Sequence, residues 1–238
     1  MSAPLQEFFA QMRPYLSGER DLPQVVEALG ASPSGDDNFA FYRVLAERNL
    51  FKILFELYGP LRTLIVRQRS ADTWRQLVRE YVDTHLPAGH HPNEAGGAFS
   101  DFLAARRQRE TSQPTVWEEV ADFCWTRTSV SSAPDGPGDG FEQRLHVRQY
   151  THAVSHIVTL LERDAEAELP EPAPELIVIY RHWQTLETRL FRPSAAGLVA
   201  LAVRQGLPVP EPLKVVPDDH VVIADEQLVA HGVLSPKP

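Results

Sequence analysis

Two histidines four residues apart are the clearest candidates for chemistry in this sequence. His152 and His156 would lie on one face of a helix, where two imidazoles can bind a transition metal. The spacing of the other potential ligands indicates no third residue for such a site. We therefore expect no metal site, and we treat both histidines as candidates for contact with a partner protein.

The single cysteine also offers little chemistry. Cys124 follows Trp117, Val120 and Ala121 at helical spacing, which predicts a buried thiol rather than a nucleophile, and one cysteine excludes an internal disulfide. The sequence contains no nucleophile elbow, no H-E-x-x-H, no Walker loop and no dinucleotide fingerprint. We expect no catalytic residue in this chain.

A local cluster of arginines is a candidate binding surface: Arg62, Arg67, Arg69, Arg75 and Arg79. Such a cluster is usually a solvated helix face, and it lacks the lysines and interleaved aromatic residues of a nucleic-acid groove. We keep Arg75 and Arg79 as candidates for contact with a partner protein.

The composition is that of a globular protein. The 238 residues are 43% hydrophobic and 23% charged, with a net charge of −9 that disfavours sequence-independent coating of nucleic acid. No apolar run approaches the roughly 20 residues of a membrane span, and the N-terminus lacks a secretory signal. We expect a cytoplasmic protein that does not enter the membrane.

The elements that position these residues change character along the chain. Residues 1–168 predict an all-helical domain. Its clearest helix is expected over 39–58, where one face, expected to be buried, carries Tyr42, Leu45, Ala46, Asn49, Ile53 and Leu57. A last long helix is expected over 141–161. The acidic, proline-rich segment that follows predicts a domain boundary.

Residues 175–238 predict a small α+β module, so that the fold class is α+β. The apolar stretch 176–180 and the alternating stretch 185–190 predict a hairpin, and Ser194 begins a helix over 195–205. Two further strands are expected at 213–216 and 220–223, with a short helix at 225–230. The order of hairpin, helix and strands is winged-helix-like, and it is also typical of peptide-recognition modules.

The strand over 176–180 is apolar at both of its alternating sets of positions. One interpretation is that both of its faces belong to the core. The other is that one face or an open edge of this sheet accepts a partner, such as an extended peptide that adds a strand.

Several segments together resemble a known bacterial family. They are FYR at 41–43, WRQLVREY at 74–81, GAFSDFL at 97–103, VADFCW at 120–125, LIVIYR at 176–181 and PSAAGL at 193–198. The family is catalogued as a putative DNA-binding domain, and its members include partner proteins of multinuclear non-heme iron-dependent oxidative enzymes, as in methanobactin biosynthesis. These motifs consist mostly of packing residues, and Cys124 replaces a glutamate that is usual in the family.

The resemblance implies a non-catalytic partner that docks on a multinuclear non-heme iron oxidative enzyme and helps recruit the leader of a ribosomally made precursor peptide. Iron would be bound only by that enzyme, and this chain would hold no cofactor. The helical domain would dock on the enzyme. The predicted contacts with the peptide lie in the hairpin: Ile177, Ile179, Arg181, Leu186 and Arg189.

The alternative is a DNA-binding transcriptional regulator whose helix 195–205 enters the major groove. A recognition helix needs several side chains that reach bases and phosphates, whereas Arg204 is the only basic residue of this one. This hypothesis therefore ranks second.

Overall fold

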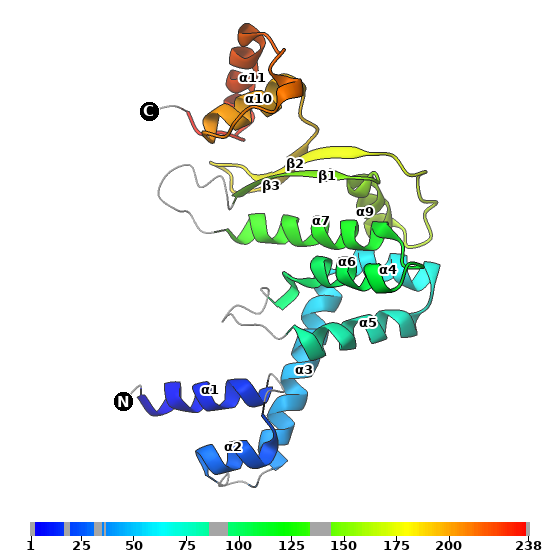
Figure 1. Ribbon diagram of the computed structural model, residues 1–238, viewed down its shortest axis with the longest axis vertical. Helices are drawn as coiled ribbons and strands as arrows, with labels where there is room; N and C mark the ends of the chain where they lie inside the picture. The colour runs from blue at the N-terminus through cyan, green and yellow to red at the C-terminus, as the bar shows by residue number, and fades with distance from the viewer. Residues whose placement is uncertain are drawn as a thin grey trace. The chain divides into compact units, whose positions relative to one another are not determined.

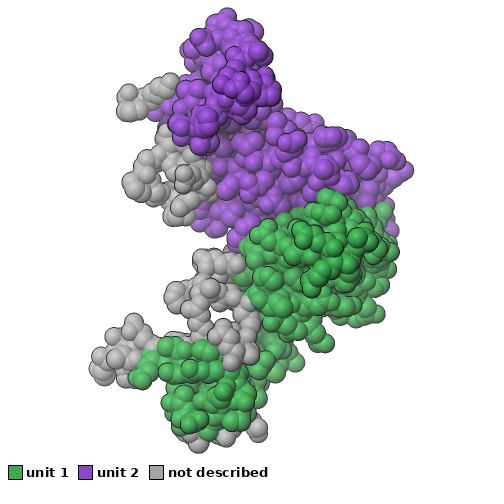
Figure 2. Space-filling model, viewed as in Figure 1, with its two compact units in different colours: residues 1–118 green, residues 119–238 purple. Residues whose placement is uncertain are grey.

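The computed structural model describes residues 3–16, 20–30, 35, 37–85, 95–133 and 144–236. The chain forms two compact units, Met1–Glu118 and Glu119–Pro238 (Figure 2). The segment 169–174, where the sequence predicts a domain boundary between 1–168 and 175–238, lies inside the second unit. The strands on its two sides belong to one sheet, so the division of the structure differs from that expected division.

The first unit is helical in its described part (Figure 1). Its elements are α1 (Ala3–Leu16), α2 (Leu22–Leu29), α3 (Asp37–Leu57), α4 (Gly59–Gln68), α5 (Ala71–Thr84), α6 (Phe99–Arg109) and the first turn of α7 (Thr115–Ser132). Helix α2 begins with a capping box, in which the side chains of Asp21 and Gln24 each accept the other residue's backbone N–H. The Ser70 side chain caps α5 by accepting the N–H of Thr73 at 3.1 Å.

An aromatic cluster joins the junction of α3 and α4 to α5 and α6 in this unit. The ring of Phe99 contacts those of Tyr58, Trp74 and Tyr81 at centroid distances of 4.9, 5.9 and 4.9 Å. The Tyr81 hydroxyl donates to the carbonyl of Ala95 at 2.6 Å, which satisfies its polar end inside the cluster. Burial raises the pKa of Tyr81 to about 12.

Helix α3 is confirmed, but its buried face differs from the predicted one. Tyr42 and Asn49, expected inside, are exposed, whereas Phe39, Leu50 and Leu54 are buried. The physical reason is that α1 and α2 pack on the side of α3 that carries Phe39, and that α5 also packs against this helix. Tertiary packing has therefore chosen one of two apolar faces of this helix.

The second unit is built on an antiparallel sheet in the order β1-β2-β3. The strands are β1 (Leu145–Tyr150), β2 (Glu175–Arg181) and β3 (Thr188–Phe191). Helices α7 and α9 (Val154–Arg163) lie along one face, and α10 (Ala195–Arg204) and α11 (Asp218–Ala230) lie on the other (Figure 1). The class α+β is therefore confirmed.

The prediction of one long helix over 141–161 is wrong. The described part of this stretch contains β1, a turn and α9, and β1 pairs with β2 so that Val147 lies opposite Val178. The stretch carries apolar residues at spacings that fit a helix, but pairing with a buried strand provides partners that a helix would lack. Tertiary context has overridden the local pattern.

The prediction of strands at 213–216 and 220–223 is also wrong. The chain forms a 3₁₀ helix at Glu211–Leu213 and then α11, which includes the short helix predicted at 225–230. Pro217 precedes the first helical residue, and Asp218 and Asp219 occupy the first turn, where acidic residues favour a helix start. These signals outweigh the β-branched residues at 221–223.

None of the described helices combines the length and the apolar character that crossing a lipid bilayer requires.

Candidate functional site

A hollow of about 470 Å³ lies beside β3 in the second unit. Its walls come from β2, β3, α10, α11 and the segments next to them, and they combine apolar with polar and basic side chains. We call it the β3 groove, and it is lined by Tyr180, Arg189, Leu190, Phe191, Arg192, Ser194, Gly197, Ala224, Gln227, Leu228, His231 and Val233. A pocket with an apolar floor and a few polar groups is the usual form of a binding site.

The outer edge of β3 is open in the described part of the chain, because β3 pairs only with β2. The N–H of His182 donates to the carbonyl of Glu187, so the hydrogen-bonded pairs of this hairpin fall at alternate positions and include Arg189 opposite Tyr180. The backbone N–H and C=O of Thr188 and Leu190 consequently point away from β2. An additional strand could bond to both residues.

The turn between β2 and β3 is held in place by a buried histidine. The Nδ1 atom of His182 accepts the N–H groups of Gln184 and Thr185, each at 3.2 Å, and Leu186 adopts a φ of 59°. The ring packs on Gly232, where a Cβ atom would lie only 2.0 Å from Nε2. Gly232 therefore allows the chain after α11 to approach the hairpin closely.

One arginine of the groove is bound by a buried carboxylate. An Nη2–H of Arg192 donates to Oε1 of Glu175 at 3.0 Å, although the Arg192 side chain is 70% exposed and that of Glu175 only 1%. The same carboxylate accepts the N–H and the hydroxyl of Ser155 at the start of α9, at 2.9 and 2.5 Å. Glu175 thus orients Arg192 and caps α9 at the same time.

The second arginine lies at the turn end of the groove. Arg189 donates to Oε2 of Glu187 from Nε at 3.1 Å and from Nη2 at 2.5 Å. The hydrogen bond from Arg189 holds the pKa of the Glu187 carboxyl below its usual value. On the same face of the sheet, the rings of Tyr180 and Phe191 meet edge to face at 5.8 Å and form the apolar floor.

The helices behind the groove are fixed by a cap and an ion pair. The Ser194 hydroxyl accepts the N–H of Gly197 at 3.1 Å and begins α10 at the groove. At the other end of α10, Arg204 donates to both carboxylate oxygens of Asp225 on α11, at 2.6 and 3.0 Å. Their side chains are only 10% and 20% exposed, so this pair joins the two helices.

The structure places the predicted peptide contacts in two environments. Ile177 and Ile179 are 1% and 0% exposed, and Arg181 is buried with Nη1 donating to the carbonyl of Ala133 at 2.5 Å. Direct peptide contact by these three residues is therefore a prediction that we correct: β2 is the central strand, so both of its edges are paired. Leu186 and Arg189 are exposed, and Arg189 lines the groove.

The predicted partner contacts are divided between the two units. Arg75 and Arg79 are exposed on α5 of the first unit, where Arg75 bonds to Asp72. His152 and His156 belong to the second unit, and His156 is exposed on α9. They are not on a common helix, because His152 lies in the turn before α9.

His152 is instead part of a turn anchored by a buried carboxylate. Its Nδ1 atom lies 2.8 Å from Oε2 of Glu119, and Oε1 of Glu119 accepts the N–H and hydroxyl of Thr151 at 2.7 and 2.8 Å. These bonds explain why Glu119 on α7 is buried. Within the described ranges, no three His, Cys, Asp or Glu side chains are grouped as a metal site requires.

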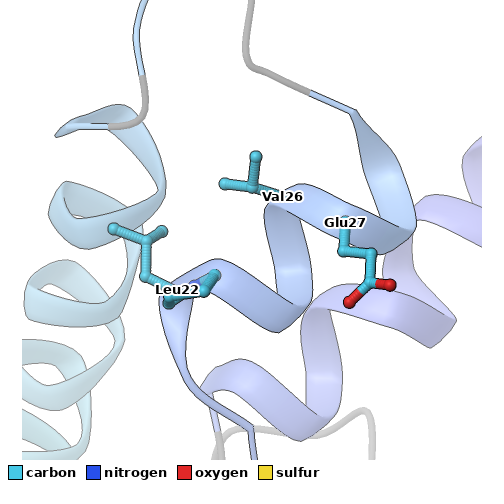
Figure 3. A pocket seen from close by; sticks show the side chains of 4 residues that line it. Leu22, Val26 and Glu27 are labelled. Carbon is cyan, nitrogen blue, oxygen red and sulfur yellow. The ribbon is translucent and has the colours of Figure 1, made fainter.

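A second hollow of about 500 Å³ lies on α2, lined by Leu22, Pro23, Val26 and Glu27. Its labelled side chains diverge rather than point to a common centre (Figure 3). Among the described residues of this lining Glu27 is the only charged one, so we do not regard the hollow as a recognition site.

Sequence reasoning missed most of the β3 groove. Leu190 ends the predicted hairpin and Phe191 and Arg192 follow it directly, and the alternation of polar and apolar residues there could have identified them as an edge. Gln227, His231 and Val233 come from α11 and the turn after it, and the chain carries no local signal that this helix reaches the hairpin.

No protein family model matches this chain, and no curated protein matches it. The resemblance drawn from the sequence motifs therefore stays a prediction.

Proposed function

We propose that this chain is a non-catalytic partner protein that binds the leader of a ribosomally made precursor peptide as an added strand along β3. It would present that peptide to a multinuclear non-heme iron oxidative enzyme. The observation that carries the proposal is the open edge of β3, with the outward backbone groups of Thr188 and Leu190 beside the β3 groove.

An added strand would obtain affinity from the backbone and specificity from the groove. Side chains at alternate positions of the peptide would lie over Tyr180 and Phe191 on one face, next to α10 and α11. The positions between them would lie over Leu190, whose side chain is 46% exposed on the other face. The sheet together with α10 and α11 would thus act as a peptide-recognition module.

The enzyme in this proposal comes from the motif resemblance. Under it, the partner would hold the iron and this chain would supply none of its ligands. The polar groups of the groove suit binding. Arg192 and Arg189 already donate hydrogen bonds to carboxylates, and Gln227 and Ser194 add neutral hydrogen-bonding groups.

The test removes a single backbone donor. Fluorescein-labelled peptides that cover the short open reading frames next to the gene are titrated with the full chain, and binding is followed by fluorescence anisotropy. Leu190→Pro deletes the outward N–H of Leu190, which an edge strand tolerates, and should weaken binding roughly tenfold or more. Leu190→Ala keeps the N–H and should retain most of the affinity.

Two outcomes would contradict the proposal. One is that no such peptide binds the wild-type chain. The other is that Leu190→Ala weakens binding as much as Leu190→Pro, which would mean that the side chain rather than the backbone edge is recognised. Circular dichroism and the thermal midpoint establish that both variants are folded.

The transcription-regulator hypothesis is weakened by one specific contact. Arg204, the only basic residue of α10, is largely buried and bonded to Asp225, so it is not presented for a phosphate or a base edge. A gel shift with genomic fragments at increasing salt tests this alternative directly, since phosphate contacts make binding salt-dependent.

A further inference from the structure

The solvent-facing side of α3 carries a regular row of large side chains. They recur at alternating spacings of three and four residues, as the core positions of a coiled coil do. We call this row the α3 seam, and it consists of Phe41, Val44, Arg48, Phe51 and Phe55.

The α3 seam lies opposite the face that packs into the first unit. At 3.6 residues per turn its five members fall within one stripe, whereas the buried Phe39, Leu50 and Leu54 fall on the other side of the helix. Phe41, Val44 and Phe55 are 55%, 43% and 48% exposed, which is unusual for three large apolar residues in a row.

The charges on and beside the seam are mostly positive. Arg48 occupies its central position and forms no ion pair with any other described side chain. Farther along, the guanidinium of Arg62 on α4 stacks over the ring of Phe55 at 3.7 Å from its centroid. The nearby carboxylates of α3 are engaged within the helix, since Glu47 lies 3.7 Å from Arg43 and Glu56 lies 3.8 Å from Lys52.

The central arginine decides what can cover this row. A charged residue at a core position of a helix pair must meet an opposite charge, because an unpaired buried charge is costly. A second copy of α3 does not provide one when the whole seam is paired: in a parallel pair in register, or in an antiparallel pair centred on the seam, Arg48 would face Arg48. The charge complementarity therefore favours a different helix with a carboxylate at that position.

We infer that the α3 seam is the docking site for an amphipathic helix of another protein, with apolar residues at its core positions and an acidic residue opposite Arg48. The apolar side chains supply the buried area, and Arg48 fixes the register and rejects partners without the acid. This inference concerns the first unit and does not depend on peptide binding by the β3 groove.

A pair of synthetic helical peptides tests it on the full chain. Both carry leucine at the core positions and glutamate at the flanking positions, which keeps the peptides from pairing with themselves. They differ only at the central core position, which is glutamate in one and lysine in the other. We expect the glutamate peptide to bind at least about tenfold more tightly in fluorescence anisotropy, and Arg48→Glu to reverse this preference.

Two neighbouring residues provide a matched control for the apolar part. Phe41 and Tyr42 are 55% and 53% exposed, but only Phe41 belongs to the α3 seam. Phe41→Asp should abolish binding of the glutamate peptide, whereas Tyr42→Asp should leave it within about twofold of the wild type, because surface substitutions away from a contact have small effects. Circular dichroism shows whether both variants keep their helices.

Three results would overturn the inference. Neither peptide binds the folded chain, or Arg48→Glu fails to reverse the preference, or Tyr42→Asp is as harmful as Phe41→Asp. A fourth contradicting result could come from sedimentation velocity. If the wild-type chain is a dimer and Phe41→Asp is a monomer, the seam binds a second copy of the chain instead.

Discussion

Among the glycines whose surroundings the structure describes, Gly232 leaves the least room for a Cβ atom. It has a φ of +69°, a region that strains a residue with a Cβ, and its Cβ would lie 2.0 Å from Nε2 of His182. The imidazole cannot easily move away, because it is 8% exposed and its Nδ1 accepts two backbone N–H groups. Gly232→Ala should therefore displace the hairpin that forms one wall of the β3 groove.

The expected loss of unfolding free energy in Gly232→Ala has two parts, backbone strain and steric overlap. A second glycine provides a measure of the backbone strain alone. Gly206 has a similar φ of +66°, but no atom lies within 4 Å of its Cβ position. Gly206→Ala should cost about 1–2 kcal/mol of unfolding free energy from backbone strain alone. Gly232→Ala should cost about 1–3 kcal/mol more, because overpacking a filled site has that typical effect.

Urea unfolding followed by circular dichroism gives both unfolding free energies, and hydrogen exchange gives the local effect. The N–H of Trp183 donates to the carbonyl of Gly232 at 3.1 Å, so its exchange should accelerate in Gly232→Ala and stay unchanged in Gly206→Ala. His182→Ala should be less harmful in the Gly232→Ala background than in the wild type, since it opens the space that the methyl group needs. Equal costs for the two glycine substitutions would refute this reasoning.

Two further predictions concern titratable groups of the second unit. Burial raises the pKa of the Cys124 thiol to about 12. This thiol should therefore stay unreactive toward Ellman's reagent at pH 8 in the folded chain and react at once in urea. Rapid labelling of the native protein would contradict its burial. The hydrogen bond from Arg189 lowers the pKa of Glu187, so the small stabilisation from this exposed pair should be present above the ordinary carboxyl pKa and disappear as the pH falls through the lowered value. Arg189→Ala should return the Glu187 pKa toward its ordinary value in an NMR titration, and an unchanged pKa would show that the pair does not form in solution.

The helix boundaries with local chemical signals could be predicted from the sequence. Asp21 with Gln24, Ser70 and Ser194 each cap a helix through their own side chains, and these caps depend only on neighbouring residues. The hairpin of β2 and β3 has the same local character. Its apolar strand and its alternating strand are close in sequence, so their pairing needs no distant partner.

The errors arose where a distant partner decides the structure. Residues 145–150 become a strand because β2, about 30 residues later, offers its edge. The buried face of α3 is selected by α1, α2 and α5, and the apolar residues at 221–223 belong to a helix that packs on the sheet. In each case the residue types fit two structures, and long-range packing selects one of them.

The placement of the peptide contacts illustrates the same point for function. Ile177 and Ile179 were predicted to contact the peptide because an apolar strand could bind one. The central strand of a sheet is apolar for a different reason, since it is buried on both faces, and β2 is that strand. Recognition through a backbone edge requires few side chains: an outward N–H, a neighbouring groove, and no proline between residues 175 and 192. Residue types alone therefore indicate such a site only weakly. The groove beside β3 is formed by the packing of α10 and α11 behind the hairpin, which the sequence does not reveal. The α3 seam is the opposite case. Its spacing can be seen in the sequence, and the structure adds that Phe41, Val44 and Phe55 are exposed while the other apolar face of the helix is buried.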